Sequence, residues 1–399
     1  MQLFKTYAFQ VKNIVNFLKK PHKKININTI NLKQKNNYLK LWVSIFSMIL
    51  ICGQSKTYGN YIDIGVTIDL SRGARQLGKN ARNGIELAIK NGNDDENAFK
   101  LAWFDDKYSS SIARKNVEKM IEDKIQYLLC PIGMELMHKY LDLIEQGKIL
   151  LLFPMPSLLD ADLPYCINFG PNYKEYAEVV TQHLISTSSP KKTIILYQND
   201  VAGKCLLSAT KKKFAESNVS VIAHPFKRNY VQLKEEIDFI KKEKPDHLGI
   251  FGPPHIVKKI INGLGDIICQ DICFFITVLE NNELYKYMKN KKLKFTGANV
   301  IPDPETSNLP VMVEFCKLAT ENNIKIDMTA VLAYICTSLF METISKLKDK
   351  SPEKCYNKFM KFSNYNFKGL NLTFIPTKNR ISNKLWLYTV EGTWEEKNM

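Results

Sequence analysis

The chain has 399 residues, of which 45% are hydrophobic, 24% charged and 11% aromatic. This composition is typical of a folded protein long enough for two domains, and it excludes disorder over most of the chain. The net charge of +16 is concentrated at the N-terminus, because nine of the 56 basic residues and none of the 40 acidic residues lie in residues 1–40. The rest of the chain is nearly balanced and has no basic stripe interleaved with aromatic residues, so nucleic acid is not an expected partner.

Residues 1–55 are predicted to be an export leader. The lysine-rich segment is followed by an uncharged apolar run, Leu41–Cys52. As a helix this run spans about 18 Å, less than the ~30 Å hydrocarbon core of a membrane, and a basic segment before a short apolar one is typical of a secretory signal peptide. Cleavage is expected after Ser55 or Gly59. Alternatively, Cys52 carries a lipid anchor, although Ile51 precedes it where bacterial lipoproteins have a small residue. Either way, the mature chain is expected in the periplasm or at the cell surface.

Strand-like runs and amphipathic stretches alternate from Tyr61 onward. Ile62–Ile68 alternates in polarity and is rich in β-branched residues, which predicts a strand. The helix at 83–90 has Ile85, Ala88 and Ile89 on one face. Further strands are predicted at 100–106, 126–130 and 149–153, and further helices at 111–123 and 135–146. This order predicts an α/β fold with a doubly wound parallel sheet, covered by helices on both faces.

A second series of the same kind begins at Lys192. Its predicted strands are 193–197, 219–223, 247–251 and 273–277, and its predicted helices are 203–217, 231–243 and 255–264. Two such series predict two lobes, with a ligand at the carboxyl ends of the strands. The last hundred residues contain helical patterns at 308–322, 328–347 and 352–362 and strand-like runs at 370–375 and 384–390. These elements are too few for a third domain, so we expect them to complete the two lobes.

Patterns typical of catalysis or metal binding are absent from the sequence. It contains no Gly-x-Ser-x-Gly elbow, phosphate-binding loop, His-Glu-x-x-His or Gly-x-Gly-x-x-Gly motif. Eight cysteines follow residue 55, none in a Cys-x-x-Cys pair and none at zinc-site spacing from a histidine. His138 and His183 have no partners at ligand spacing, and a helix cap explains Asp105–Asp106 more simply than a catalytic carboxylate pair does. We therefore expect neither an enzyme nor a cofactor.

Several segments resemble the leucine/isoleucine/valine-binding proteins, in order and spacing. They are Ile64–Gly78, Arg82–Ile89, Trp103–Ala113, Cys130–Gly133, Gln146–Pro154, Ile167–Pro171, Asn366–Phe374 and Leu385–Gly392. The resemblance covers about residues 60–396. It implies a type I periplasmic-binding fold, with three hinge crossovers joining an N-terminal lobe (60–168 plus 300–366) to a C-terminal lobe (169–299 plus 367–399).

The resemblance also implies a ligand between the lobes, held by hydroxyl groups and backbone N–H groups of the first lobe and by an aromatic and an acidic residue of the second. Ser157 matches an expected hydroxyl, whereas Met134 and Glu135 stand where other hydroxyl residues are expected. Ala202 replaces an aromatic residue, and Glu280 is a candidate partner for an ammonium group. The full set of candidate ligand-binding residues is Leu77, Met134, Glu135, Met155, Ser157, Asp200, Ala202, Pro254 and Glu280. These substitutions suggest a more apolar cleft than an amino acid needs.

The expected function is that of an extracytoplasmic receptor, a monomer that closes on an amino acid or related small molecule and delivers it to an ABC permease. Two alternatives remain open at this point. One is a sensor or regulator with the same fold, and the other is a diverged scaffold or surface protein that no longer binds a ligand.

Overall fold

The computed structural model describes residues 61–92, 99–158, 163–227, 232–278 and 282–399. The predicted leader, residues 1–55, and the candidate ligand-binding residue Glu280 lie outside these described residues.

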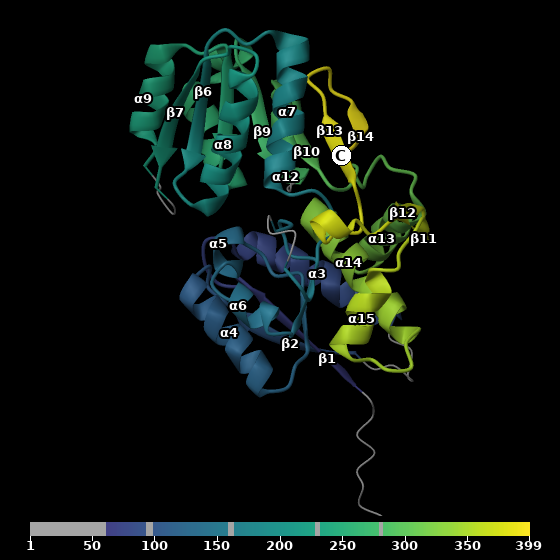
Figure 1. Ribbon diagram of the computed structural model, residues 1–399. Helices are drawn as coiled ribbons and strands as arrows, with labels where there is room; N and C mark the ends of the chain where they lie inside the picture. Colours follow the sequence, from purple (N-terminus) through teal and green to yellow (C-terminus); the bar gives the residue numbers. More distant parts are fainter. Residues whose placement is uncertain (1–60, 93–98, 159–162, 228–231, 279–281) are drawn as a thin grey trace, which may run out of the picture. The chain divides into compact units, whose positions relative to one another are not determined.

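The first sheet has five parallel strands in the order β2-β1-β3-β4-β5 (Figure 1). The strands are β1 (Ile62–Ile68), β2 (Phe99–Asp105), β3 (Tyr127–Leu129), β4 (Leu150–Leu152) and β5 (Cys166–Ile167). The helices between them are α3 (Arg75–Gly92), α4 (Ser110–Glu122), α5 (Met134–Met137) and α6 (Leu141–Glu145). The single helix predicted at 135–146 is therefore wrong, since the chain interrupts it between α5 and α6. There, Tyr140 leaves the helical conformation with φ −132° and buries its ring.

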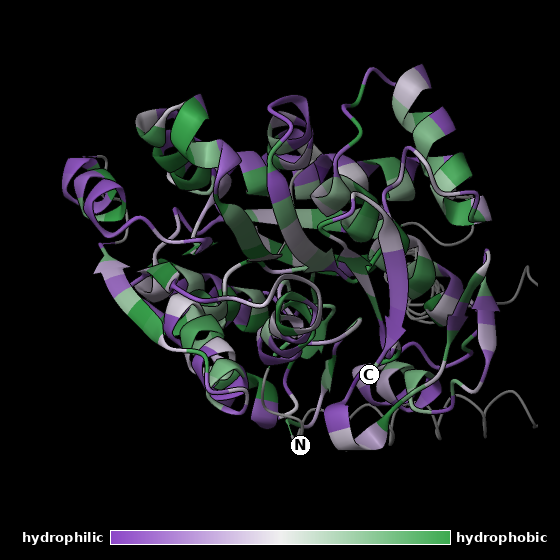
Figure 2. Ribbon diagram, turned by 90° about the horizontal axis from the view of Figure 1, so that it is seen from above, coloured by the Kyte–Doolittle hydropathy of each residue, from purple (hydrophilic) through white to green (hydrophobic). Residues whose placement is uncertain are grey.

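The second sheet has seven strands in the order β14-β13-β10-β9-β8-β6-β7. The parallel strands are β6 (Thr193–Gln198), β7 (Val221–Phe226), β8 (His247–Phe251), β9 (Cys273–Val278) and β10 (Lys294–Asn299). The two antiparallel strands are β13 (Lys384–Tyr388) and β14 (Trp394–Asn398). The sequence did not predict β10 or β14, and it did not predict the mixed sheet. β14 reads Trp-Glu-Glu-Lys-Asn, which lacks an apolar face, and it is coloured hydrophilic beside the C-terminus in Figure 2.

The second sheet is covered by helices on both faces. These are α7 (Tyr173–Ser188), α8 (Val201–Ala215), α9 (Lys234–Glu243), α10 (Pro254–Leu264), α11 (Asp266–Gln270) and α12 (Asn282–Asn290). Side chains alternate between the two faces along each strand. In β6, Ile195 packs in the core on the α7 and α8 side, whereas Ile194 and Leu196 pack with α9 and α10 on the other.

The C-terminal elements are α13 (Pro310–Glu321), α14 (Met328–Ser345), α15 (Pro352–Phe359), the β11–β12 ribbon (Tyr365–Phe367 and Leu370–Leu372) and a 3-10 turn, η2 (Pro376–Lys378). α14 is apolar all round and packs along α3. Gly84 makes this approach possible, because a Cβ there would lie 2.0 Å from the carbonyl oxygen of Ala330. By length and composition α14 is the one helix of the described residues that could span a membrane, but 78% of it is buried, as expected for a core helix.

Candidate ligand-binding groove

Three adjoining cavities line up at the carboxyl ends of strands from both sheets. Leu77 and Tyr108 line all three cavities, and the three cavities therefore form one continuous groove. The innermost, which we call the inner cavity, has about 910 Å³ of empty space, counting the part open to solvent. This position, at the ends of parallel strands, is where α/β sheets bind ligands.

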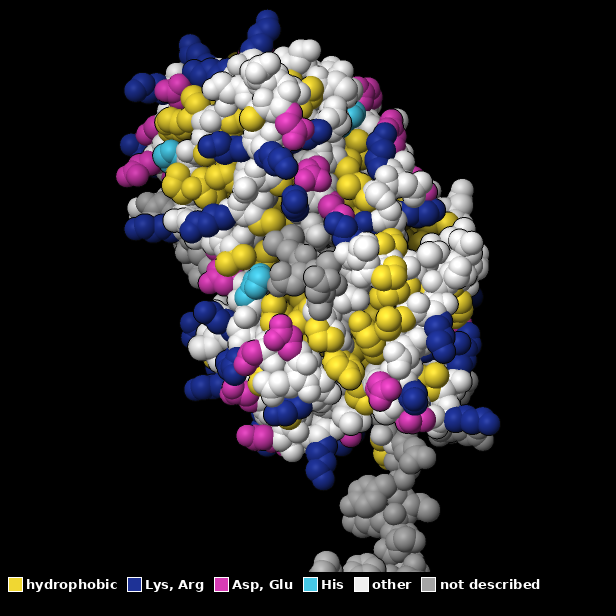
Figure 3. Space-filling view, in the orientation of Figure 1, with side chains coloured by type: hydrophobic (Ala, Val, Ile, Leu, Met, Phe, Trp, Pro, Cys, Tyr) yellow, Lys and Arg dark blue, Asp and Glu magenta, His cyan; other side chains and the backbone are white. Residues whose placement is uncertain are grey.

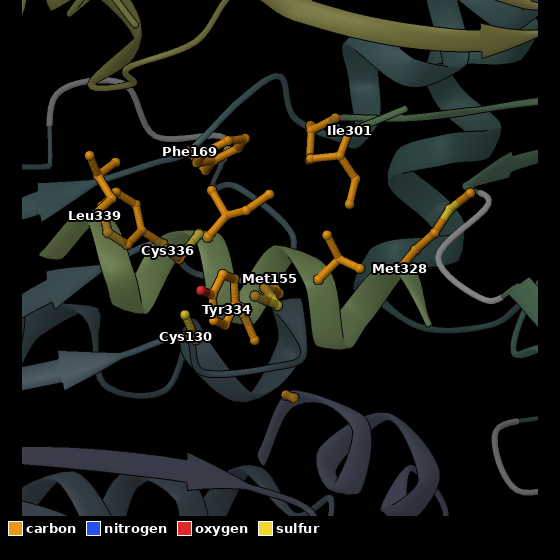
Figure 4. Packing of buried hydrophobic residues seen from close by; sticks show 14 of the residues in the cluster. Cys130, Met155, Phe169, Ile301, Met328, Tyr334, Cys336 and Leu339 are labelled. Carbon is orange, nitrogen blue, oxygen red and sulfur yellow. The ribbon is translucent and has the colours of Figure 1, made fainter. Parts of the chain in front are cut away.

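Aromatic and sulfur-containing side chains make up much of the inner cavity wall. They come from loops after β3 and β4, from the start of α7 and from α14: Met134, Phe153, Met155, Phe169, Tyr173, Tyr176, Met328 and Cys336. Figure 4 shows Cys336 on α14, with Cys130 and Met155 in the same region. The wall is suited to contact with an apolar or ring-shaped group.

Two strained residues begin the loops that enter the inner cavity. Cys130 follows β3 with φ 48°, and Phe153 follows β4 with φ 54°. Both side chains are fully buried. A residue other than glycine in this left-handed region costs of order 1–3 kcal/mol and persists only where the surrounding structure enforces it, often at ligand sites. The strain turns each loop sharply from its strand toward the groove.

Ser157 supplies a hydroxyl group to the inner cavity. It is 7% exposed and forms an isolated parallel bridge with Asn172, the N-cap of α7. Among the described residues, its hydroxyl forms no hydrogen bond. Thr329 and Asn299 also line the cavity, and the Asn299 side-chain amide donates to the sulfur of Met328 at 3.0 Å.

The second lobe contributes Asp200, Ala202 and Pro254 to the groove. Asp200 is the N-cap of α8, and its carboxylate accepts from the Gly203 N–H at 2.9 Å and from the Gln198 side-chain amide. These hydrogen bonds show that the Asp200 carboxylate caps α8, and the residue also faces the groove. Pro254 is the first residue of α10. Proline is tolerated there because an N–H group in the first turn has no hydrogen-bond acceptor within the helix.

Charged side chains gather at the outer end of the groove. Lys227, His255, Lys258 and Glu283 line this third cavity, and the Lys258 ammonium lies 3.6 Å from the Glu283 carboxylate. Burial, and then the nearby Lys259, lower the pKa of His255 below its ordinary value. The outer end is therefore polar, in contrast to the inner cavity.

The structure brings seven of the nine predicted site residues to the groove: Leu77, Met134, Met155, Ser157, Asp200, Ala202 and Pro254. Glu135 follows Met134 on α5 and lines none of the three cavities, because successive helical residues point in different directions. Sequence reasoning missed Tyr108, Tyr173, Tyr176 and the α14 residues. Tyr173 and Tyr176 had a local signal, since they follow the segment Ile167–Pro171 at the start of the second lobe.

A buried ion pair lies where two chain segments pass side by side near the groove. The Arg380 guanidinium donates to the Glu175 carboxylate at 2.6 Å, and these side chains are only 3% and 10% exposed. The same carboxylate accepts from the N–H of Asn172, which completes a capping box at the start of α7. Asn168 pairs with residues 379–381 through backbone hydrogen bonds. These contacts fix the end of α7 that carries Tyr173 and Tyr176.

No group of three or more His, Cys, Asp or Glu side chains among the described residues is arranged to hold a metal ion. Acidic and basic side chains are interspersed on the face shown in Figure 3.

Two α/β lobes with a groove at their strand ends define a class of two-lobed ligand-binding proteins. The periplasmic binding protein family model matches residues 61–395, and the chain belongs to this family. Its fold is the type I periplasmic-binding fold that the sequence predicted. The family consists of solute-binding proteins that normally work outside the cytoplasm.

Solved structures support the same fold. A possible leucine/isoleucine/valine-binding protein from Rhodopirellula baltica has a TM-score of 0.74 and 15% identity, covering 87% of this chain and 98% of that one. An ABC-transporter solute-binding protein from Rhodopseudomonas palustris in complex with 3,4-dihydroxybenzoic acid has a TM-score of 0.72 and 16% identity, covering 85% and 97%. A leucine-binding protein from Thermotoga maritima has a TM-score of 0.68 and 12% identity, covering 84% and 97%. No curated protein sequence matches the chain.

Proposed function

We propose that this protein is an extracytoplasmic receptor that captures a small molecule in the groove and presents it to an ABC permease. The observation that carries the proposal is that a single groove is lined from both sheets. Ser157 and Met155 come from the first lobe, and Ala202 and Pro254 come from the second. A ligand that contacts both walls favours the closed arrangement of the lobes over the open one, because only the closed arrangement provides both sets of contacts.

The proposed lobes are residues 60–168 plus 300–366 and residues 169–299 plus 367–399. The packing of α14 on α3 and the pairing of β13 with β10 support this division. Residues 1–55 would direct export, as a signal peptide or through a lipid anchor on Cys52. The protein would bind its ligand without converting it.

The size of the ligand is that of an amino acid or a related small molecule. The family resemblance favours an amino acid, and the R. palustris neighbour holds 3,4-dihydroxybenzoic acid. The aromatic and sulfur-containing wall of the inner cavity suits the apolar part of either molecule better than its charged part.

The first test is a thermal-shift screen of the purified protein against amino acids, short peptides, amides, small acids and sugars. A ligand at a hundredfold excess over its dissociation constant adds about 2.7 kcal/mol of stability, which corresponds to a shift of a few degrees. Small-angle scattering with the ligand found should show a smaller radius of gyration. A folded protein that no solute stabilises would contradict the receptor function and favour the scaffold alternative.

A further inference from the structure

The inner cavity offers a ring-shaped group contacts from several sides. Phe153 and Phe169 meet edge to face with centroids 6.4 Å apart, and Tyr173 and Tyr176 do so at 6.1 Å. Met155 lies on the same wall. Aromatic and thioether groups bind apolar rings and branched chains through dispersion and area burial, and they do not replace the hydration of an anion.

Several backbone N–H groups beside this cavity are already used by the protein. The N–H of Met155 donates to Pro131 at 2.9 Å, and that of Gly133 donates to Met155 at 2.9 Å. The N–H of Phe153 donates to Ile167 at 2.7 Å. Pro131, Pro154 and Pro156 in the same loops have no N–H to offer. These two loops therefore provide few backbone donors to an anion.

Positive charge is placed away from the inner cavity. No lysine, arginine or histidine is among the described residues that line it. Lys227 and Lys258 line the outer end of the groove, and Lys258 already pairs with Glu283. A carboxylate moved into the inner cavity would lose water without gaining a cationic partner there.

We propose that the inner cavity selects an uncharged, mainly apolar group about the size of a substituted ring and discriminates against a carboxylate. This inference rests on the proposed receptor function. The Ser157 hydroxyl lines the cavity and is placed to form one hydrogen bond with a neutral amide or hydroxyl on that group. The preferred ligand class is thus a neutral aromatic or branched aliphatic amide or alcohol, rather than an amino acid or a benzoate.

Matched pairs of small molecules test this preference directly. Isothermal titration of the full chain would compare benzamide with benzoate, phenylacetamide with phenylacetate, and isovaleramide with isovalerate, because each pair differs mainly in charge. We expect the amide of at least one pair to bind at least about tenfold more tightly than the acid. The same titrations with leucine and 3,4-dihydroxybenzoate compare the amides with the kinds of ligand named for the structural neighbours.

A variant that introduces a positive charge separates a charge-based preference from nonspecific apolar binding. Leu77 lines all three cavities and is only partly buried, so Leu77→Arg would place a cation at the inner cavity. We expect it to reduce or reverse the amide preference about tenfold. The control Ile267→Arg adds the same charge at an exposed position that lines none of the three cavities, so it should keep the preference. Circular dichroism of both variants verifies that they are folded.

The outcomes of these titrations distinguish a wrong selectivity of the inner cavity from a wrong receptor function. Tighter binding of the acids or of leucine would overturn the selectivity and leave the receptor function standing. Failure of every amide, acid and amino acid to bind would overturn both. An amide preference that Leu77→Arg leaves unchanged would also overturn the inference, because charge would not be its cause.

Discussion

At the scale of single residues, the groove uses side chains for two different purposes. Ser157 lines the inner cavity with its hydroxyl, whereas the carboxylate of Asp200 caps α8. Sequence reasoning found both positions because each follows a strand. It could not separate the two roles, because hydrogen-bond partners depend on coordinates.

Replacing Ser157 should weaken ligand binding without unfolding the protein. Ser157→Ala removes one hydrogen bond to a polar group of the ligand, which corresponds to about 1 kcal/mol or about fivefold in Kd. Titration calorimetry with any ligand found in the screen measures the effect, and urea unfolding should give a midpoint close to that of the unaltered protein. Unchanged affinity would remove Ser157 from the site.

Removing Glu175 should destabilise the protein strongly. Glu175→Ala leaves the Arg380 guanidinium buried without its carboxylate, and it also removes half of the α7 capping box. The expected loss in the free energy of unfolding is about 3–5 kcal/mol. Lys378→Ala is the control, because its side chain is 45% exposed and its ammonium lies 3.6 Å from the same carboxylate, so its loss should cost less than about 1 kcal/mol. Equal losses of unfolding free energy from the two variants would show that burial does not determine how much the Glu175–Arg380 pair stabilises the protein.

At the scale of elements, α14 links the packing of α3 to the wall of the inner cavity. It carries Met328, Leu332 and Cys336 to the inner cavity wall and packs its opposite side against α3. The sequence predicted this helix at 328–347, close to the observed Met328–Ser345. Its uniform apolarity contains no periodic signal for which face meets the ligand, so the groove residues on it could not be foreseen.

The contact between α3 and α14 depends on Gly84. Gly84→Ala would place a methyl group 2.0 Å from a carbonyl oxygen and force the helices apart, so we expect a loss of at least about 2 kcal/mol despite the better helix propensity of alanine. Gly92→Ala on the same helix is the control, since its nearest neighbour at 3.0 Å is the flexible end of Met341. Urea unfolding compares the two variants, and a Gly84→Ala protein as stable as Gly92→Ala would contradict this packing argument.

At the scale of the whole molecule, stability should fall as the pH drops from about 7 to 5. Burial lowers the pKa of His183 below its ordinary value of 6.5, although Glu391 and Glu395 act in the opposite direction and Lys397 adds to the lowering. The neutral ring also accepts from the N–H of Val390 at 3.3 Å. Because the unfolded chain binds this proton more readily, the free energy of unfolding decreases as the pH falls below 6.5.

Urea unfolding at several pH values measures this dependence. His183→Gln keeps an acceptor for the Val390 N–H and removes the titration, so its stability should vary less with pH than that of the unaltered protein. If His183→Gln has the same slope as the unaltered protein, His183 does not contribute to the acid sensitivity.

The sequence by itself determined the fold class, the order of most strands and helices, and the edge of each sheet where a ligand site would form. Period-two and helical patterns are local, so they can be read along the chain. The edge strand β14, the break between α5 and α6, the Glu175–Arg380 pair and the aromatic wall of the groove were decided only by the tertiary structure. Each of these depends on contacts between residues far apart in the chain or on a side chain buried by other elements, and local patterns do not encode such contacts.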